Sequence, residues 1–256
     1  MRLKTYSPKK VATKVLLGTV LGDGCLVTSQ YGTGSTYLVM NHGIDQIAYV
    51  LWKMQMLEPV TGPFSVRMFQ RTGKGEWGVR PKINVWSLSN KYMGHIHDDF
   101  YTLDTNDTGR FVKVVRLNVL RRLTPESLAV WFMDDGSLSV TKSTPYMRLA
   151  TNGFTGEENE LICEYMSETW EVHFRMTRHV SGSWYLYADT KSTMRFIELI
   201  TPYMCPSMLY KIDPSCSAEH LDQTQGDEMI RTVLKNTELV RKYQPLNESV
   251  EVVNSL

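Results

Sequence analysis

Hydrophobic and polar positions follow two periods along the first half of the chain. A spacing near 3.6 residues predicts helices, and strict alternation predicts strands. Pro8 suits a helix start, whereas Gly22-Asp23-Gly24 and Pro59 mark helix ends. The predicted elements are a helix over 8–21, a hairpin of strands 26–28 and 36–40, a helix over 45–57, a hairpin of strands 65–71 and 79–88, a helix near 91–101 and an extended piece over 111–117.

The same order of elements returns in the second half. Thr124 suits the N-cap position and Pro125 the first turn of a helix that runs into Asp134-Asp135-Gly136, and Thr155 leads a later helix. The predicted elements are helices over 125–133, 156–170 and 191–202, and strands over 137–141, 146–151, 172–178 and 183–189.

Two copies of helix, two strands, helix, two strands and helix predict an α+β fold of two pseudo-symmetric αββαββα halves. We divide the chain into an N-terminal half, a linker, a C-terminal half and an extension with one amphipathic stretch at 228–242. Their ranges are 1–117, 118–123, 124–213 and 214–256.

Composition excludes some classes of protein. Hydrophobic residues make up 42% of the 256, no run is long enough to span a membrane, and no secretory signal is visible, so we expect an intracellular protein whose compartment stays open. The four cysteines are scattered, which favours reduced thiols over a zinc site or disulfides; they are Cys25, Cys163, Cys205 and Cys216.

Charge is distributed unevenly. Residues 1–123 hold 17 Lys and Arg against 8 Asp and Glu, a net charge of +9, whereas residues 124–213 carry −5 and residues 214–256 carry −3. A basic half favours contact with phosphates, although the total is only +1.

Each half begins with a helix that ends in Asp-Gly, in LLGTVLGDG at 16–24 and LAVWFMDDG at 128–136. A carboxylate at a helix C-terminus is electrostatically unfavourable, because the helix dipole is negative there. A divalent cation would compensate at both places, since carboxylates and free carbonyls are ligands that Mg²⁺ prefers. The alternative is that each Asp-Gly is only a polar helix end.

Gly18 and Gly22 share one face of the first helix and allow another backbone to come close. If the two Asp-Gly helices cross there, Asp23 and Asp135 emerge side by side. Two metal sites a short distance apart would then suit a double-strand cut.

These two segments resemble the motifs of the LAGLIDADG homing endonucleases, in the monomeric branch that carries two motifs per chain. LTPESLAVWFMDDGSL at 123–138 resembles the second motif, and LATNGFTGEE at 149–158 and PSMLYKID at 206–213 resemble the same branch, so the likeness covers about residues 11–213. The second motif departs from the pattern, because Val130 and Asp134 stand where small residues are usual, which leaves close packing mainly to Gly18, Gly22 and Ala129.

The resemblance implies a site-specific endonuclease that hydrolyses DNA at a long target and leaves short 3′ overhangs. It implies that Asp23 and Asp135 bind Mg²⁺, with Mn²⁺ or Ca²⁺ able to substitute for binding, and that Gly22 and Asp134 offer backbone carbonyls. A catalytic lysine from the end of each half is implied at Lys211 and, on a looser match, at Lys113. Solvated surface charge is the alternative for both lysines.

The family fold implies a saddle of two antiparallel sheets, packed through the motif helices, over the major groove of double-stranded DNA. A monomer without membrane contact would suffice. The candidate DNA-binding residues on the polar strand faces are Gln30, Tyr31, Arg67, Arg71, Arg80, Lys82, Asn84, Lys142, Arg148, Asn152, Arg175, Arg178 and His179.

Three other functions stay open. One is a maturase of the same fold that binds intron RNA, another is a catalytically silent DNA-binding protein, and the last is a structural protein without metal chemistry. Both acids being present favours the nuclease. The absence of splicing-type flanks beside the first motif predicts a host other than an intein, with intron-encoded and free-standing genes undecided.

Overall fold

The computed structural model describes residues 7–28, 35–70, 81–104, 109–141, 143–213 and 215–216, without the side chains of 69 and 70. The first half runs through α1 Pro8–Leu21, β1 Gly24–Thr28, β2 Thr36–Gly43, η1 Ile44–Gln46, α2 Ile47–Thr61, β3 Phe64–Gln70, β4 Pro81–Ser87, α4 Lys91–Phe100, β5 Tyr101–Leu103, β6 Phe111–Lys113 and α5 Leu117–Leu120. The second runs through α6 Pro125–Asp135, β7 Gly136–Thr141, β8 Thr144–Ala150, α7 Gly156–Trp170, β9 Phe174–Arg178, β10 Trp184–Ala188, α8 Thr190–Ile200, η2 Thr201–Tyr203 and η3 Pro206–Lys211.

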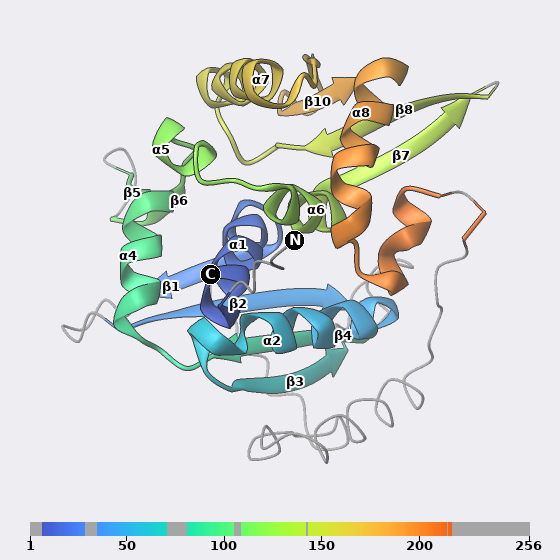
Figure 1. The fold of residues 1–256 in the computed structure, drawn as a ribbon. Helices are drawn as coiled ribbons and strands as arrows, with labels where there is room; N and C mark the ends of the chain where they lie inside the picture. The colour runs from blue at the N-terminus through green and yellow to red at the C-terminus, as the bar shows by residue number, and fades with distance from the viewer. Residues whose placement is uncertain are drawn as a thin grey trace.

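Two antiparallel sheets of the same topology form the frame. Their strand orders are β1-β2-β4-β3 and β7-β8-β10-β9, so the second half repeats the first strand for strand, and β5 and β6 form a separate short pair. Figure 1 shows α1 and α6 side by side between the two sheets. The predicted α+β fold with antiparallel sheets is confirmed.

The two central helices are buried on almost every side, because each contacts the other helix and its own sheet. Leu16, Val20, Phe132 and Met133 are all fully inaccessible to solvent, and one continuous apolar core contains residues of both halves. The buried helices bring the ends of α1 and α6 to the same place in the molecule.

Glycines on α1 make this contact possible. A Cβ at Gly18 would overlap the Ser127 carbonyl and approach Val130 to 2.8 Å, and a Cβ at Gly22 would lie 2.5 Å from the Asp134 Cβ. The bulky second-motif residues Val130 and Asp134 therefore meet glycine on the first helix, in agreement with the packing expected of Gly18 and Gly22.

Most helix ends follow the local sequence. Ser7 caps α1, with its Oγ 3.4 Å from the Lys10 amide, and Thr155 and Glu158 form a reciprocal capping box on α7. Thr124 occupies the N-cap of α6 without a side-chain bond to the helix backbone, contrary to its predicted capping role. Its Oγ1 lies 3.4 Å from the Ser127 hydroxyl instead.

Two predicted boundaries are wrong. α2 continues through Pro59 to Thr61, because the Gly62 amide and the Thr61 hydroxyl bond to carbonyls of the last turns. The extended piece predicted over 111–117 ends as a strand at Lys113, and a short helix begins at Leu117. The amphipathic stretch at 228–242 lies outside the described residues, as do residues 29–34 and 71–80 of the two first-half hairpins.

No helix in the described part of the chain is both long and apolar enough to cross a membrane.

Candidate metal and nucleic-acid site

The ends of α1 and α6 place two carboxylates together. Asp23 follows the C-cap Gly22, and Asp135 is the last residue of α6 before Gly136 begins β7. Burial, then the charges of Asp23 and Asp134, raise the pKa of Asp135 to about 7. Burial and Asp134 also raise the pKa of Asp23, while Lys53 opposes the shift. Such poorly compensated acids fit a divalent cation, which would supply the missing positive charge.

A lysine reaches the end of each motif helix from the end of the same half. Lys113 on β6 donates to the carbonyls of Gly22 and Gly24 at 3.0 and 2.9 Å. Lys211 on η3 donates to the carbonyls of Met133 and Asp134 at 2.5 and 3.1 Å. Each carbonyl keeps a second lone pair that a metal ion can use.

Burial lowers the pKa of both lysines, and the neighbouring aspartates oppose that shift. Lys113 and Lys211 therefore lie beside the carboxylates, half-buried, rather than as solvated surface charges. The structure places the two aspartates, both lysines and the carbonyls of residues 22 and 134 in one region.

The Asp134 side chain has partners that the sequence did not reveal. Its Oδ1 accepts hydrogen bonds from Lys53 Nζ at 2.6 Å and Tyr49 Oη at 2.8 Å, and its Oδ2 accepts from the Asp23 amide at 3.2 Å. The side chains of Lys53 and Asp134 are both completely buried. The sequence did not point to Lys53, because a lysine in an amphipathic helix is normally on its solvated face. Nor did it show that Tyr49 would bond to a residue of the second motif.

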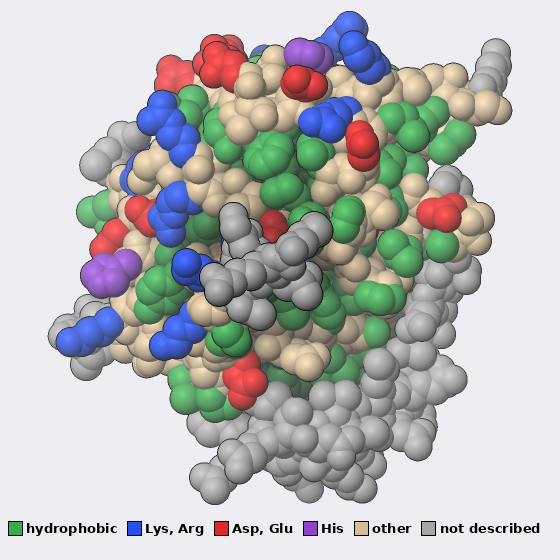
Figure 2. Space-filling model, viewed as in Figure 1, with side chains coloured by type: hydrophobic (Ala, Val, Ile, Leu, Met, Phe, Trp, Pro, Cys, Tyr) green, Lys and Arg blue, Asp and Glu red, His purple; other side chains and the backbone are tan. Residues whose placement is uncertain are grey.

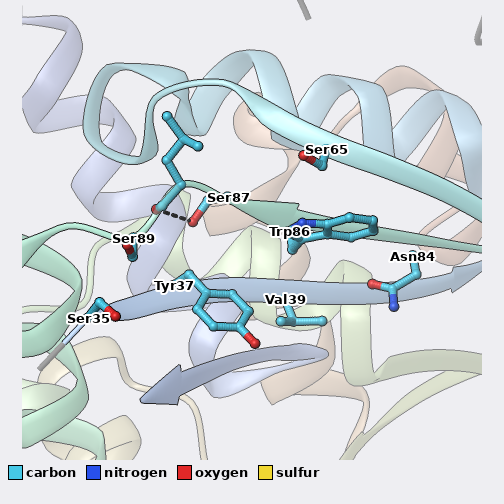
Figure 3. Close-up of a pocket in the computed structure, with 9 residues that line it drawn as sticks. Ser35, Tyr37, Val39, Ser65, Asn84, Trp86, Ser87 and Ser89 are labelled. Atoms are coloured by element: carbon cyan, nitrogen blue, oxygen red, sulfur yellow. Dashed lines mark hydrogen bonds between the residues drawn. The ribbon is translucent and has the colours of Figure 1, made fainter. Parts of the chain in front are cut away.

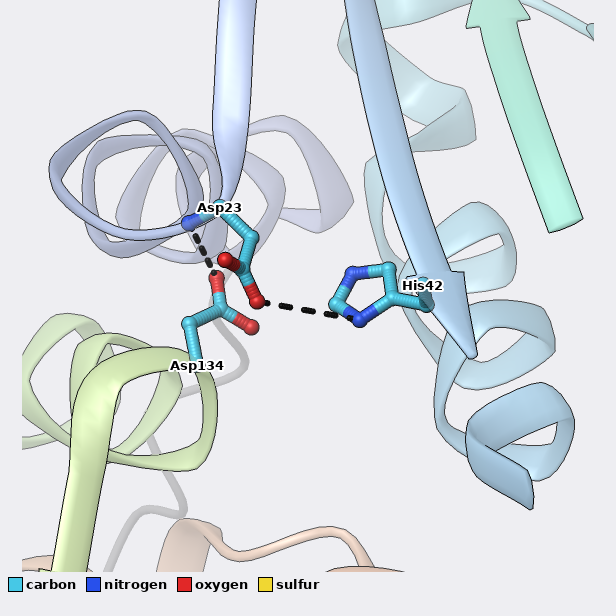
Figure 4. A group of neighbouring side chains, drawn as sticks. All are labelled: Asp23, His42 and Asp134. Atoms are coloured by element: carbon cyan, nitrogen blue, oxygen red, sulfur yellow. Dashed lines mark hydrogen bonds and ion pairs between the residues drawn. The ribbon is translucent and has the colours of Figure 1, made fainter. Parts of the chain in front are cut away.

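His42 is a second unpredicted neighbour of the acids. Its Nδ1 lies 3.0 Å from Gln46 Oε1 and 3.7 Å from an Asp23 carboxylate oxygen, and its Nε2 is buried without a hydrogen-bond partner (Figure 4). Burial and the Lys53 charge lower the pKa of His42 to about 4, so the ring is neutral at pH 7. Asp23, His42 and Asp134 lie close enough to share a metal ion, but the Asp134 carboxylate is already bonded to three donors.

The outer face of the first sheet carries aromatic and amide side chains. Tyr37 and Trp86 lie along this face with Asn84 and line a hollow there (Figure 3). Asn84 Oδ1 is buried without a partner, and exposed Arg67 stands opposite Asn84 on β3. Lys82, two residues before Asn84 on β4, is half-buried.

The outer face of the second sheet holds a preordered arginine. Arg148 on β8 lies over the rings of Tyr146 and Tyr185, with centroid distances of 5.7 and 5.5 Å. It lines a hollow that contains Asp135, together with Asn152 and His179. This hollow connects the proposed metal-binding acid directly to the sheet surface.

Not every candidate lies on that face. Arg175 stands opposite Tyr187, on the same side as Arg148, whereas Arg178 stands opposite Trp184 on the other side of the sheet, where its Nε donates to the Gly182 carbonyl at 3.1 Å. Outside the described residues are Gln30, Tyr31, Arg71, Arg80 and Lys142.

Five acidic residues of the second half lie on α7, away from this outer face. α7 carries five glutamates and covers the inner side of the sheet through buried Ile162, Tyr165 and Met166. Figure 2 shows acidic side chains at the top of the molecule, over α7. The net charge of −5 therefore does not describe the surface around Arg148.

Comparison with known proteins agrees with this architecture. The chain is 31% identical over 218 residues to Protein RecA of Mycobacterium gastri, covering 78% of this chain and 46% of that protein, and it spans about half the length of the RecA relatives it matches. It is 26% identical over 210 residues to the DNA endonuclease I-ChuI of Chlamydomonas applanata, covering 77% of this chain and 92% of that one.

The homing endonuclease I-WcaI, solved bound to its DNA recognition sequence, has a similar fold, with a TM-score of 0.67, 19% identity and coverage of 81% of this chain and 88% of that one. The model of the LAGLIDADG DNA endonuclease family matches residues 13–196, which include both motifs and both sheets. The chain belongs to the LAGLIDADG DNA endonuclease family.

Proposed function

We propose that this protein is a site-specific endonuclease that hydrolyses both strands of double-stranded DNA with a divalent metal. The observation that carries the proposal is the meeting of Asp23 and Asp135 at the ends of two buried helices, each with a lysine beside it. The I-ChuI and I-WcaI relatives support the choice of DNA as the substrate. Both motifs lie in one chain, so a monomer suffices.

Asp23 and Asp135 would hold the metal, with the carbonyls of Gly22 and Asp134 as further oxygen ligands. Mg²⁺ is the proposed ion; bound there, it stabilises negative charge on the scissile phosphate and activates a water nucleophile. Lys113 and Lys211 would add positive charge beside the developing phosphorane, and loss of such a group typically slows a reaction about 10²- to 10³-fold.

The two outer sheet faces would bind the major groove. Arginine suits guanine edges and phosphates, and asparagine suits adenine. On the described strands and turns the proposed contacts are Arg67, Lys82, Asn84, Arg148, Asn152, Arg175 and His179. Arg178 would need to leave the Gly182 carbonyl and the Trp184 ring to take part.

The test incubates purified protein with a library of long duplexes, with and without Mg²⁺, and sequences the ends produced. We expect Mg²⁺-dependent cuts at a few related sites with short 3′ overhangs. Asp23→Asn and Asp135→Asn should abolish cutting of at least one strand, and Lys113→Met and Lys211→Met should slow it about 10²-fold.

The control is Asp98→Asn, which removes a carboxylate from the exposed side of α4 and should cut as the wild type does. Double-strand cuts that persist in both motif-aspartate variants, or no cuts in any duplex, would refute the proposal. Binding of intron RNA without cleavage of DNA would favour a maturase instead.

A further inference from the structure

The Asp134 carboxylate is an anchor between the two halves of the molecule. It belongs to the second motif, but all three of its hydrogen-bond donors belong to the first half: Lys53 and Tyr49 on α2, and the Asp23 amide at the end of α1. Tyr49 and Lys53 are four residues apart, so they share one face of α2. The Lys53 ammonium also lies 4.5 Å from the centre of the Tyr49 ring.

Burial makes this arrangement demanding. A carboxylate without solvent contact needs both a counter-charge and donors for its oxygens, and Lys53 and Tyr49 provide them. Burial and Asp134 raise the pKa of Tyr49 well above its ordinary value, so the phenol stays a donor. The Asp134 side chain thus holds the Asp23 backbone through Oδ2, while Lys53 and Tyr49 hold its Oδ1.

The anchor is one-sided. The position of the first motif that corresponds to Asp134 is Gly22, where a side chain would collide with the Asp134 carboxylate. Among the described residues, no side-chain oxygen accepts a hydrogen bond from the Asp135 amide in the way that Asp134 accepts from Asp23. The backbone of Asp23 is thus fixed by a contact that Asp135 lacks.

We propose that Lys53 is a positioning residue of the metal centre, which fixes the Asp134 carboxylate and through it the backbone of Asp23. This inference rests on the proposed function and assigns the residue a role on one of the two acids. Its loss should affect the chemistry that depends on Asp23 more than the chemistry that depends on Asp135.

A purely structural role is the competing explanation, because breaking one partner of a buried ion pair destabilises any fold. Replacing both charged partners by apolar side chains of similar size often restores stability. The double variant Lys53→Met, Asp134→Leu therefore separates folding from positioning. It keeps the carbonyl of residue 134 and removes the anchor together with both buried charges.

The experiment compares the wild type, Lys53→Met, the double variant, Asp23→Asn and Asp135→Asn. Thermal unfolding reports folding, calorimetric titration with Ca²⁺ reports metal binding, and cleavage of a strand-labelled duplex recovered from the library reports each strand separately. The control is Lys14→Met, which removes the other ion pair between the halves, from Lys14 to Glu126 at the start of α6.

We expect the double variant to melt several degrees above Lys53→Met and close to the wild type. It should nevertheless bind Ca²⁺ at least 5-fold more weakly and cut at least 10-fold more slowly than the wild type. A slightly displaced catalytic group typically lowers a reaction rate by about 10- to 100-fold. Its strand pattern should follow that of Asp23→Asn in weaker form. Lys14→Met should cut and bind Ca²⁺ as the wild type does.

Wild-type cleavage and Ca²⁺ affinity in the double variant would overturn the inference, and so would a pattern that follows only Asp135→Asn. Should the double variant not fold, Tyr49→Phe provides the test. It removes one hydrogen-bond donor to the Asp134 carboxylate and keeps the ion pair with Lys53. An unchanged Ca²⁺ affinity and cleavage rate in Tyr49→Phe would then refute the anchor. A wild type that cuts no duplex would refute the proposed function, whereas weaker Ca²⁺ binding in the double variant would still support the anchor.

Discussion

At the scale of single residues, the candidate metal centre contains two groups whose pKa values are shifted in opposite directions. Burial and nearby carboxylates raise the pKa of Asp135 to about 7, while burial and the Lys53 charge lower the pKa of His42 to about 4. Both shifts mean that the folded protein disfavours the charged form of each side chain while no metal ion is bound.

The first prediction concerns stability without metal. Between its ordinary value of 3.8 and about pH 7, folded Asp135 keeps a proton that the unfolded chain has lost, so its contribution to stability falls as the pH rises through this window. His42 acts in the opposite direction: from pH 6.5 down to about 4 the unfolded chain binds a proton that the folded protein refuses, so stability falls as the pH falls.

Urea unfolding in EDTA between pH 4 and 8 measures the sum of these effects. Asp135→Asn should remove the loss of stability on the alkaline side, so the variant gains on the wild type from pH 5 to 8. Binding of Ca²⁺ at pH 6 should release up to about one proton from the wild type, seen as buffer-dependent heat. Identical pH profiles for the two proteins would contradict the raised pKa.

Sequence predicted the acids and missed their supports. Asp23, Asp135 and Lys211 stand in recognisable motifs, whereas Lys113 followed from the order of elements on a looser match. Tyr49 and Lys53 carry no local signal, because their roles come from hydrogen bonds to Asp134 on α6, about 80 positions away in the chain. His42 carries none either, because its role comes from lying beside Asp23 at the end of α1. The available clue was one lysine within the apolar sequence IAYVLWKMQML.

At the scale of elements, the crossing of α1 and α6 depends on glycine at one position more than on helix propensity. A side chain at Gly18 would meet the Ser127 carbonyl and Val130, both in the tightly packed α6. By contrast, a Cβ at Gly94 in α4 would meet only the Thr36 hydroxyl, at 3.7 Å.

The second prediction compares two alanine substitutions in helices. Gly18→Ala should lower the free energy of unfolding by about 1–3 kcal/mol through overpacking, despite its gain in helix propensity. Gly94→Ala should raise it by about 0.5–1 kcal/mol, because the added methyl has room and the unfolded chain loses freedom. Chemical denaturation measures both, and equal effects would contradict the close approach of α1 to α6.

The strands next to the acids also differ between the halves. Cys25, Val39, Trp86 and Ser65 form one row across the first sheet, two residues after Asp23. The row that begins two residues after Asp135 is Ser137, Arg148, Tyr187 and Arg175. The first row is largely apolar, whereas the second carries two arginines and a tyrosine.

The third prediction assigns base reading to Arg148. Two tyrosine rings restrict its guanidinium beside the hollow of Asp135, so little entropy is lost when it binds a guanine edge. Arg148→Gln should weaken the preference for guanine near the cut by about 10- to 100-fold, with other positions unchanged. Sequencing of cleaved library members measures this.

The matched control is Arg195→Gln on α8, which removes a half-buried arginine outside the outer sheet faces and should leave every position unchanged. A uniform fall in affinity for all sequences, with a shallower salt dependence, would instead identify Arg148 as a phosphate contact and contradict base reading.

Element boundaries that depended on local signals were well predicted, such as the start of α7 after Thr155 and the strand pairs of both sheets. Those that depended on neighbours were not. α2 passes through Pro59 because its last turn has other hydrogen bonds, and the chain leaves the extended form after Lys113, whose amine is bonded to α1–β1 carbonyls. Tertiary contacts decided both cases.

At the scale of the whole molecule, the two halves form one folding unit. A single core runs through both, and within the described residues two ion pairs, Lys14 to Glu126 and Lys53 to Asp134, connect them. The fourth prediction is therefore a single cooperative unfolding transition, with the same midpoint for far-ultraviolet circular dichroism and for tryptophan fluorescence. Two separated transitions would contradict the shared core.

The one-sided anchor on Asp134 also limits how the chain could be rebuilt. A symmetric dimer made from two copies of the first half would place glycine opposite each Lys53, because residue 22 would occupy the position of Asp134 in the partner. It would bury two lysines and provide neither with a carboxylate. The two halves have become complementary parts rather than interchangeable copies, so exchanging or duplicating one of them requires residues 22, 53 and 134 to change together.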